Sequence, residues 1–177
     1  DLLELLPGET SKQHSLNLAP LLSSAGVPAD KPQFCLEPKN EPYDKGELAE
    51  QMVADIKETI VNKTGGEFSY QVRNVNRSIG ARLSGEIAKL YGNYGMADKP
   101  IRLKLNGSAG QSFGVFNAGG LEMYLEGDAN DYVGKGMADG KIVIYPSPES
   151  EFETQEASII GNTCLYGATG GALYAAG

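Results

Sequence analysis

The chain has 177 residues, enough for one or two domains with a buried core, and its 15 basic and 23 acidic residues give a net charge of −8. This acidic balance argues against a nucleic-acid partner, because phosphate neutralisation needs clustered Lys and Arg. No run of 18 apolar residues is present, so no membrane span is expected. Two cysteines, Cys35 and Cys164, are too few for a disulfide framework or a zinc cluster and favour a reducing, cytoplasmic location.

The first part of the chain is rich in proline. Six of the nine prolines lie within the first 42 residues, among leucines that keep no sustained period. This composition predicts an extended linker or arm over residues 1–44 that lies on another surface. Residues 1–8 lack the basic start and long apolar core of a signal peptide. The expected contact points of the arm are Leu2, Leu3, Leu5, Leu6, Leu16, Leu18, Leu21 and Leu22.

The next segment has the pattern of an amphipathic helix. Asp44 and Glu47 have capping-box spacing, and Lys63 precedes a pair of glycines that would end the helix. The apolar stripe consists of Leu48, Met52, Ile56 and Ile60. We therefore predict a helix over 45–63, within a capping segment 45–66 that covers the open end of a repeat stack. A partner-binding helix is the alternative.

Residues 68–75 alternate in polarity and predict a strand. The segment 77–87 can then be aligned with a later glycine repeat by a shift of 34, which places Gly80 on Gly114. This alignment predicts a first coil of the repeat, with the loop 92–100 projecting from it. A short helix through Ile79, Leu83, Ile87 and Leu90 fits the same spacing, so both interpretations stay open at this point.

Between residues 107 and 140 the glycines recur every 20 residues. A shift of 20 also places Leu103 on Met123 and Leu105 on Leu125, and a shift of 51 finds a third copy beyond a polar insertion at 146–156. Segments 121–125 and 141–145 have strand character. A fixed period of this length indicates stacked supersecondary units. The predicted fold class is mainly β, a single-stranded right-handed parallel β-helix with turns of ~20 residues over 67–177.

Glycine suits the corners of such repeats because it tolerates positive φ and allows neighbouring backbones to approach closely. We predict that the repeat glycines are structural: Gly80, Gly85, Gly107, Gly110, Gly114, Gly119, Gly120, Gly127, Gly134, Gly140, Gly161, Gly170 and Gly171. A phosphate loop is not indicated, because residues 134–137 lack the Lys-Ser/Thr ending of that motif. Corner residues Asp128, Asp131, Asn106, Asn117, Asn130 and Asn162 are interpreted as caps of turns rather than as calcium or substrate ligands.

The residues that commonly perform catalysis are sparse. Cys164 aligns with Phe113 and Val133, which predicts a small buried apolar side chain rather than a nucleophile. The only histidine, His14, lies in the proline-rich segment, as does Cys35. We therefore predict no catalytic, cofactor-binding or metal-binding residue in this chain.

Four segments carry a resemblance to a known family: residues 77–87, 106–120, 127–137 and 156–171. In these glycine strings the whole chain resembles the C-terminal domain of the large subunit of bacterial glutamate synthase. A more distant similarity, in repeat style alone, is to the solenoid subunit of formylmethanofuran dehydrogenase.

The resemblance implies a parent enzyme that makes two L-glutamates from L-glutamine and 2-oxoglutarate, with FMN, an iron–sulfur cluster and reductant from NADPH or ferredoxin in its other domains. It implies a noncatalytic scaffold that positions the glutaminase and synthase domains. The implied partners are those domains of the same subunit and the small subunit. The alternatives are a protein-interaction module using the loops 92–100 or 147–156, and a free-standing β-helix enzyme.

Two departures from the repeat lead to further expectations. Leu165 replaces the glycine of positions 114 and 134, and Ser158 replaces that of 107 and 127, so the third repeat should turn differently at both corners. The chain stops at Gly177 directly after a strand-like segment, whereas family members continue with further coils. We therefore expect a fragment whose last coil is adhesive and self-associates.

Overall fold

The computed structural model describes residues 10–15, 17–23, 26–32, 34–38 and 46–177. The chain divides into two compact units, Asp1–Glu41 and Pro42–Gly177. The first unit contains two single-turn helices, α1 (Ser11–His14) and α2 (Ala19–Leu22). Of the leucines expected to dock, Leu2, Leu3, Leu5, Leu6 and Leu16 lie outside the described residues, and Leu21 is exposed. The interpretation of residues 1–44 as a linker stays a prediction.

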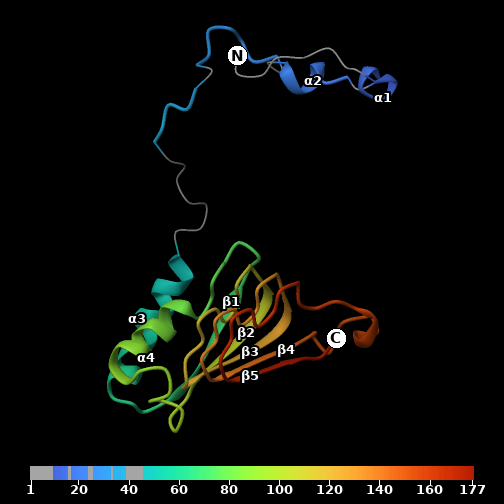
Figure 1. The fold of residues 1–177 in the computed structure, drawn as a ribbon. Helices are drawn as coiled ribbons and strands as arrows, with labels where there is room; N and C mark the ends of the chain where they lie inside the picture. The colour runs from blue at the N-terminus through green and yellow to red at the C-terminus, as the bar shows by residue number, and fades with distance from the viewer. Residues whose placement is uncertain (1–9, 16, 24–25, 33, 39–45) are drawn as a thin grey trace. The chain divides into compact units, whose positions relative to one another are not determined.

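The second unit is built on a five-stranded sheet in which all strands are parallel and follow one another in chain order (Figure 1). The strands are β1 (Gly66–Val72), β2 (Ile101–Ala109), β3 (Leu121–Ala129), β4 (Lys141–Tyr145) and β5 (Ala172–Ala175). Leu103 stands opposite Met123, and Gly107 opposite Gly127. The 20-residue register read from the sequence is therefore confirmed between β2 and β3.

Strands β2, β3 and β4 bury alternate side chains, as expected for a sheet with one covered face. The core fills the space between this face, two helices and the segments that return the chain from one strand to the next. Its largest fully buried side chains are Phe113, Met52, Ile56, Ile60, Leu83, Ile87, Met96, Ile101, Leu103, Leu121, Met123 and Leu125. The hydrophobic effect of this aliphatic interior stabilises the stack.

Helix α3 (Glu47–Val61) confirms the amphipathic helix, with Met52, Ile56 and Ile60 buried. It begins at Glu47 because Gly46 adopts a left-handed conformation (φ 75°) immediately before it. Asp44, the expected cap, lies outside the described residues. The helix contacts edge strand β1, where the Tyr70 hydroxyl donates a hydrogen bond to Asp55.

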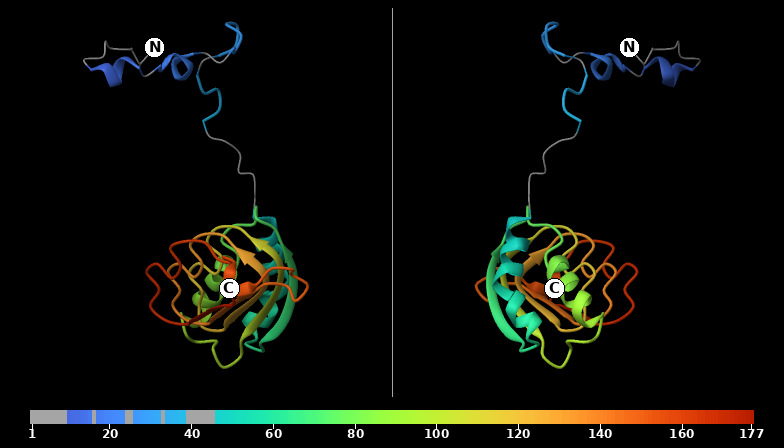
Figure 2. Two further views of the ribbon diagram at one scale, coloured as in Figure 1. Left: turned by 90° about the vertical axis from the view of Figure 1, so that its right-hand side faces the viewer. Right: turned by 90° about the vertical axis from the view of Figure 1, so that its left-hand side faces the viewer.

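Helix α4 (Ala81–Tyr91) lies beside α3 (Figures 1 and 2). Both sequence interpretations of this region are correct in part. Residues before the helix belong to the repeat, since the Ser78 amide donates to the Gln111 carbonyl and the Gly114 amide donates to the Ile79 carbonyl, both at 2.9 Å. The chain then turns at Gly80 (φ 94°) and becomes helical.

The predicted fold class is wrong. The structure is a mixed α/β fold with one five-stranded parallel sheet and helices, not a mainly β right-handed parallel β-helix. The 20-residue period fixes the strand register, but it does not make the return segments (110–120, 130–140 and 161–171) into strands. These segments are turns because left-handed residues recur within each of them, and left-handed backbone interrupts an extended strand.

The third repeat departs from expectation at one corner and agrees at the other. Leu165 has φ 57°, close to the 68° of Gly114 and the 65° of Gly134, so the prediction of a different turn there is wrong. Hydrogen bonding to the preceding repeat holds Leu165 in the left-handed region, since its amide donates to the Val133 carbonyl at 2.8 Å. Ser158, by contrast, lacks the positive φ of Gly107 and Gly127.

Replacement of Gly140 by Val should lower the free energy of unfolding by roughly 3 kcal/mol or more, because left-handed backbone and backbone crowding both oppose a β-branched side chain. Gly140 has φ 85°, and a Cβ there would lie 2.8 Å from the Ala118 carbonyl oxygen and overlap the Asn117 amide nitrogen. Thermal and urea unfolding of the chain would measure the change.

Gly85→Ala is the matched control. Gly85 lies in α4 with no atom near the position of a Cβ. Alanine should raise stability by about 0.5–1 kcal/mol through its higher helix propensity. If Gly140→Val were as stable as the unmodified chain, position 140 would not require glycine.

Candidate functional site

The glycine-rich return segments use their own amide groups to hold the repeats together. The Gly134 amide donates to the Phe113 carbonyl at 2.9 Å, and the Gly136 amide donates to the Tyr166 carbonyl at 2.8 Å. Gly119 likewise donates to the Asn93 carbonyl at 2.6 Å. A phosphate-binding loop needs free amides that converge on the ligand. These amides are already paired within the fold.

The predicted structural glycines fall into three groups. Those with positive φ are Gly80, Gly107, Gly114, Gly120, Gly127, Gly134, Gly140 and Gly171. Those with ordinary φ, at which a Cβ would collide with a neighbouring repeat, are Gly110, Gly119, Gly161 and Gly170. Gly85 lies in helix α4 and faces open space, so the structure shows no conformational need for glycine there.

Side-chain amides at the corners bond to the backbone. Asn117 is fully buried, and its amide nitrogen donates to the carbonyls of Leu121 (2.9 Å) and Asp139 (3.0 Å), whereas its Oδ1 has no partner. The Asp131 carboxylate accepts a hydrogen bond at 2.8 Å from the backbone amide of Asn162, 31 residues away, and so joins two repeats instead of capping its own turn. Within the described residues no group of three or more His, Cys, Asp or Glu has the arrangement of a metal site.

The surface of the second unit has hollows beside the insertion and on the outward face of the sheet. The larger, of about 450 Å³, lies between the strand ends and the insertion and is lined among others by Ser108, Glu126, Asp128 and Phe152. The smaller, of about 290 Å³, lies on the outward face of the sheet between Lys104, Tyr124 and Tyr145. Their linings offer hydrogen bonds, charged groups and ring faces, which suit the binding of a ligand.

The outward face of the sheet carries charges of alternating sign in one row. Glu122 lies 3.0 Å from Arg102 and 3.6 Å from Lys141, on the two neighbouring strands. Partial burial opposes ionisation of Glu122, but hydrogen bonds from Arg102 and Tyr124 outweigh it and lower the pKa of Glu122. These cross-strand pairs support the register of the sheet.

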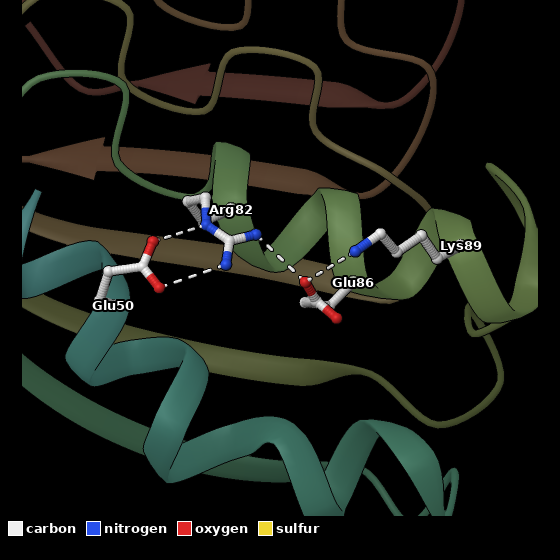
Figure 3. Close-up of polar contacts among 4 residues, drawn as sticks. All are labelled: Glu50, Arg82, Glu86 and Lys89. Carbon is white, nitrogen blue, oxygen red and sulfur yellow. Dashed lines mark hydrogen bonds and ion pairs between the residues drawn. The ribbon is translucent and has the colours of Figure 1, made fainter.

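A second charged group joins α3 to α4 (Figure 3). The Arg82 guanidinium contacts both carboxylate oxygens of Glu50, at 2.7 and 3.2 Å, and one oxygen of Glu86 at 3.1 Å. Lys89 reaches Glu86 at 3.4 Å. Hydrogen bonds from Arg82 lower the pKa of Glu50 and of Glu86. The sequence analysis did not foresee this group, because Glu50 lies 32 residues from Arg82.

The two cysteines have different surroundings. Cys164 is half-buried against the core, its thiol donates to the Gly161 carbonyl at 3.3 Å, and burial raises its pKa. Cys164 thus packs on the core as a partly buried small side chain, where a fully buried one was predicted, and the absence of a nucleophilic role stays a prediction. Cys35 is exposed, and its thiol donates to the Glu37 carbonyl at 2.8 Å.

One surface feature was missed by the sequence analysis, and we name it the Lys135 cluster after its central residue. It consists of Phe116, Tyr132, Lys135, Leu165 and Tyr166, which come from all three return segments. The Lys135 ammonium lies 5.3 Å from the ring centre of Tyr132 and 5.9 Å from that of Tyr166. The spacing of the five residues in sequence has no regular period, which is why no pattern indicated them.

None of the helices in the described part of the chain is long and apolar enough to cross a bilayer.

Comparison with known proteins gives a consistent result. The family model described as GXGXG motif matches residues 47–177. Ferredoxin-dependent glutamate synthase 2 of Synechocystis is 54% identical over 123 residues, which are 70% of this chain and 8% of that protein. The large chain of NADPH glutamate synthase from Azospirillum brasilense is 39% identical over 178 residues, 100% of this chain and 12% of that protein.

Similarity extends to chloroplast proteins. The ferredoxin-dependent glutamate synthase of Oryza sativa is 39% identical over 180 residues, 100% of this chain and 11% of that protein. The chain thus spans about a tenth of the length of these relatives. The resemblance to glutamate synthase inferred from the glycine strings is confirmed.

The environments of the cysteines predict their order of modification. A thiol reagent at neutral pH should label Cys35 first and Cys164 markedly more slowly, because burial lowers both the access and the thiolate fraction of Cys164. Peptide mass spectrometry after timed labelling would resolve the two. A Cys35→Ser variant should retain only the slow phase, whereas fast labelling of Cys164 would contradict its assigned packing.

The charged group between α3 and α4 predicts a pH-dependent stability. The pKa values of Glu50 and Glu86 lie below the ordinary value of 4.5, so their contribution is present above that pH and is lost as the pH falls through the lowered values. Arg82→Met should therefore lower Tm at neutral pH, by an amount that shrinks as the pH falls below 4.5 and through the lowered pKa values of the two glutamates.

Arg73→Met is the control for this prediction, because Arg73 is exposed and makes no ion pair with a described residue. Its effect on Tm should be small at every pH. A destabilisation by Arg82→Met that stayed constant between neutral and acidic pH would assign the effect to lost packing instead of charge.

Proposed function

The chain belongs to the GXGXG motif family, and we propose that it serves as a noncatalytic structural domain of a glutamate synthase large subunit. In this proposal it holds the glutaminase domain and the FMN and iron–sulfur synthase domain in their relative positions. The parent reaction converts L-glutamine, 2-oxoglutarate and reductant into two molecules of L-glutamate. The relatives include both ferredoxin-dependent and NADPH-dependent enzymes, so the proposal leaves the electron donor open.

The observation that supports this proposal most directly is the use made of the glycine amides. In each return segment they donate to carbonyls of a neighbouring repeat, as the Gly114, Gly134 and Gly136 amides do. Close backbone approach at many points resists shear between repeats, since displacement would break several hydrogen bonds at once. A stiff stack of this kind suits a spacer between domains that must keep a fixed separation.

The same proposal assigns the partners and cofactors. The partners are the other domains of the same subunit and, through exposed loops, the small subunit. FMN, the iron–sulfur cluster and the nicotinamide or ferredoxin contact belong to those other domains. Self-association through edge strand β5, where Tyr174 is 58% exposed, is a subsidiary part of the proposal, and sedimentation of the chain at increasing concentration would test it.

An interaction module is the second candidate. The exposed ring of Phe152 lies at the rim of the 450 Å³ hollow beside the insertion, which is the arrangement of an anchor site for a partner. A module of this kind would lose binding of the small subunit on Phe152→Ser without loss of coupling between the two reactions of the large subunit.

The scaffold proposal predicts uncoupling when the stack is deformed. In the intact synthase, Gly140→Val should leave glutamine hydrolysis active but raise the amount of glutamine consumed for each 2-oxoglutarate converted. The reason is that the two catalytic domains would no longer keep their relative positions. Parallel assays of both substrates measure this ratio, and bound FMN is measured by absorbance.

Gly85→Ala serves as the control, and this variant should consume glutamine and 2-oxoglutarate in equal amounts. Loss of FMN reduction with an unchanged substrate ratio in Gly140→Val would contradict a scaffold role, because it would place this domain in the synthase chemistry itself.

A further inference from the structure

The Lys135 cluster is an apolar and aromatic surface that the fold does not use. Phe116 is 63% exposed, Tyr166 65%, Leu165 41% and Tyr132 37%. They are contiguous around Lys135. Phe116 lies over Gly136, and Leu165 lies against Gly134. Large exposed apolar side chains that gather in one place mark sites of interaction more often than scattered ones do.

The backbone conformation at three positions of the cluster is unfavourable for bulky side chains. Phe116 (φ 55°), Tyr132 (φ 67°) and Leu165 (φ 57°) are in the left-handed region, where bulky side chains are rare. The equivalent positions of the other repeats hold small residues with similar φ. They are Gly136 and Gly167 for Phe116, Ser112 and Thr163 for Tyr132, and Gly114 and Gly134 for Leu165. The fold accepts small residues at these positions, so it does not require aromatic or branched ones.

The ammonium group at the centre of the cluster forms no ion pair with a carboxylate in the described part of the chain. Lys104 and Lys141 each lie within 4 Å of a carboxylate, at 2.7 and 3.6 Å, but Lys135 forms no such pair with a described residue. The faces of Tyr132 and Tyr166 hold its ammonium group in place instead. An oriented cation with an apolar surround is complementary to a carboxylate that itself has apolar neighbours.

We propose that the Lys135 cluster docks a segment of the same glutamate synthase chain, outside residues 1–177, that presents an Asp or Glu carboxylate between apolar side chains. The proposal rests on the proposed function, since it names the surface through which the scaffold holds a neighbouring domain. The relatives supply ample chain for such a segment, because this chain matches 8 to 12% of their length. Tyrosine, which the cluster presents twice, is among the residue types that contribute most to the energetics of protein interfaces.

The first test uses the intact synthase and a zero-length carbodiimide, which joins an amine to a carboxylate only when they touch. Lys135 should form a cross-link with an Asp or Glu outside residues 1–177, identified by mass spectrometry. Lys135→Arg keeps the positive charge but cannot form this amide, so the cross-link should vanish in that variant. In a mixture with isotope-labelled enzyme, a cross-link from Lys135 of one copy to that Asp or Glu of another copy would show self-association. That result would overturn the proposal.

The second test measures exposure of the rings by nitration of tyrosine in the same enzyme. Lys135→Glu reverses the charge, so Tyr132 and Tyr166 should nitrate roughly tenfold faster, as expected if the docked state falls from about nine tenths of the population to a minor fraction. Lys135→Arg should keep the slow rate. Tyr94, which is exposed and lies outside the cluster, supplies the reference rate within each sample.

Equal nitration of the cluster in the unmodified enzyme and in Lys135→Glu, without a cross-link to another domain, would overturn the proposal. This outcome is distinguishable from failure of the scaffold role, which is judged by substrate coupling in Gly140→Val. If that variant uncouples the reactions while the cluster nitrates freely, the domain is a scaffold that docks through another surface. If the cluster is protected but coupling is unaffected, the docking surface stands and the scaffold role does not.

Discussion

Because each return segment donates amide hydrogens to the carbonyls of a neighbouring repeat, successive repeats must stand one strand spacing apart, about 4.8 Å. At that separation a side chain does not fit where two backbones cross. A Cβ on Gly110 would lie 2.6 Å from the Asn76 carbonyl oxygen, and a Cβ on Gly161 would lie 2.7 Å from the backbone nitrogen of Asp131. The glycine content is thus a requirement of close stacking, and it accounts for both the parallel register and the turn-like return path.

Helices α3 and α4 cover the part of the core that the repeats alone would leave exposed. Helix α4 takes the place of a return segment directly after the first turn, and α3 contacts both α4 and edge strand β1. Their buried faces supply Ile56, Ile60 and Ile87 to the same core as the strands. The ion pair between Arg82 and Glu50, visible in Figure 3, joins the two helices, and the pair between Arg82 and Glu86 lies within α4.

The arrangement of repeats and helices decides where groups available for recognition lie. The interior is largely aliphatic, and glycine amides such as those of Gly114, Gly134 and Gly136 are paired within the fold. The features that remain for recognition lie on the sheet face, beside the insertion and at the Lys135 cluster. In the cluster, bulky residues occupy left-handed positions that glycine, serine or threonine fill in other repeats. Strained backbone of this kind is concentrated at functional sites, where the strained residue serves binding or catalysis.

The sequence by itself determined the period, the strand register and helix α3, because glycine spacing and apolar periodicity are local signals that translate directly into backbone geometry. It also indicated the family, through glycine strings whose composition few folds need. Only the tertiary structure decided that a single sheet forms and that the remaining chain is turns and helix. Hydrogen bonds between repeats hold even Leu165 in a conformation its side chain disfavours, and no local propensity reports that. The Lys135 cluster and the Arg82 group depend on the same cause, since each joins residues that only the packing of distant segments brings together.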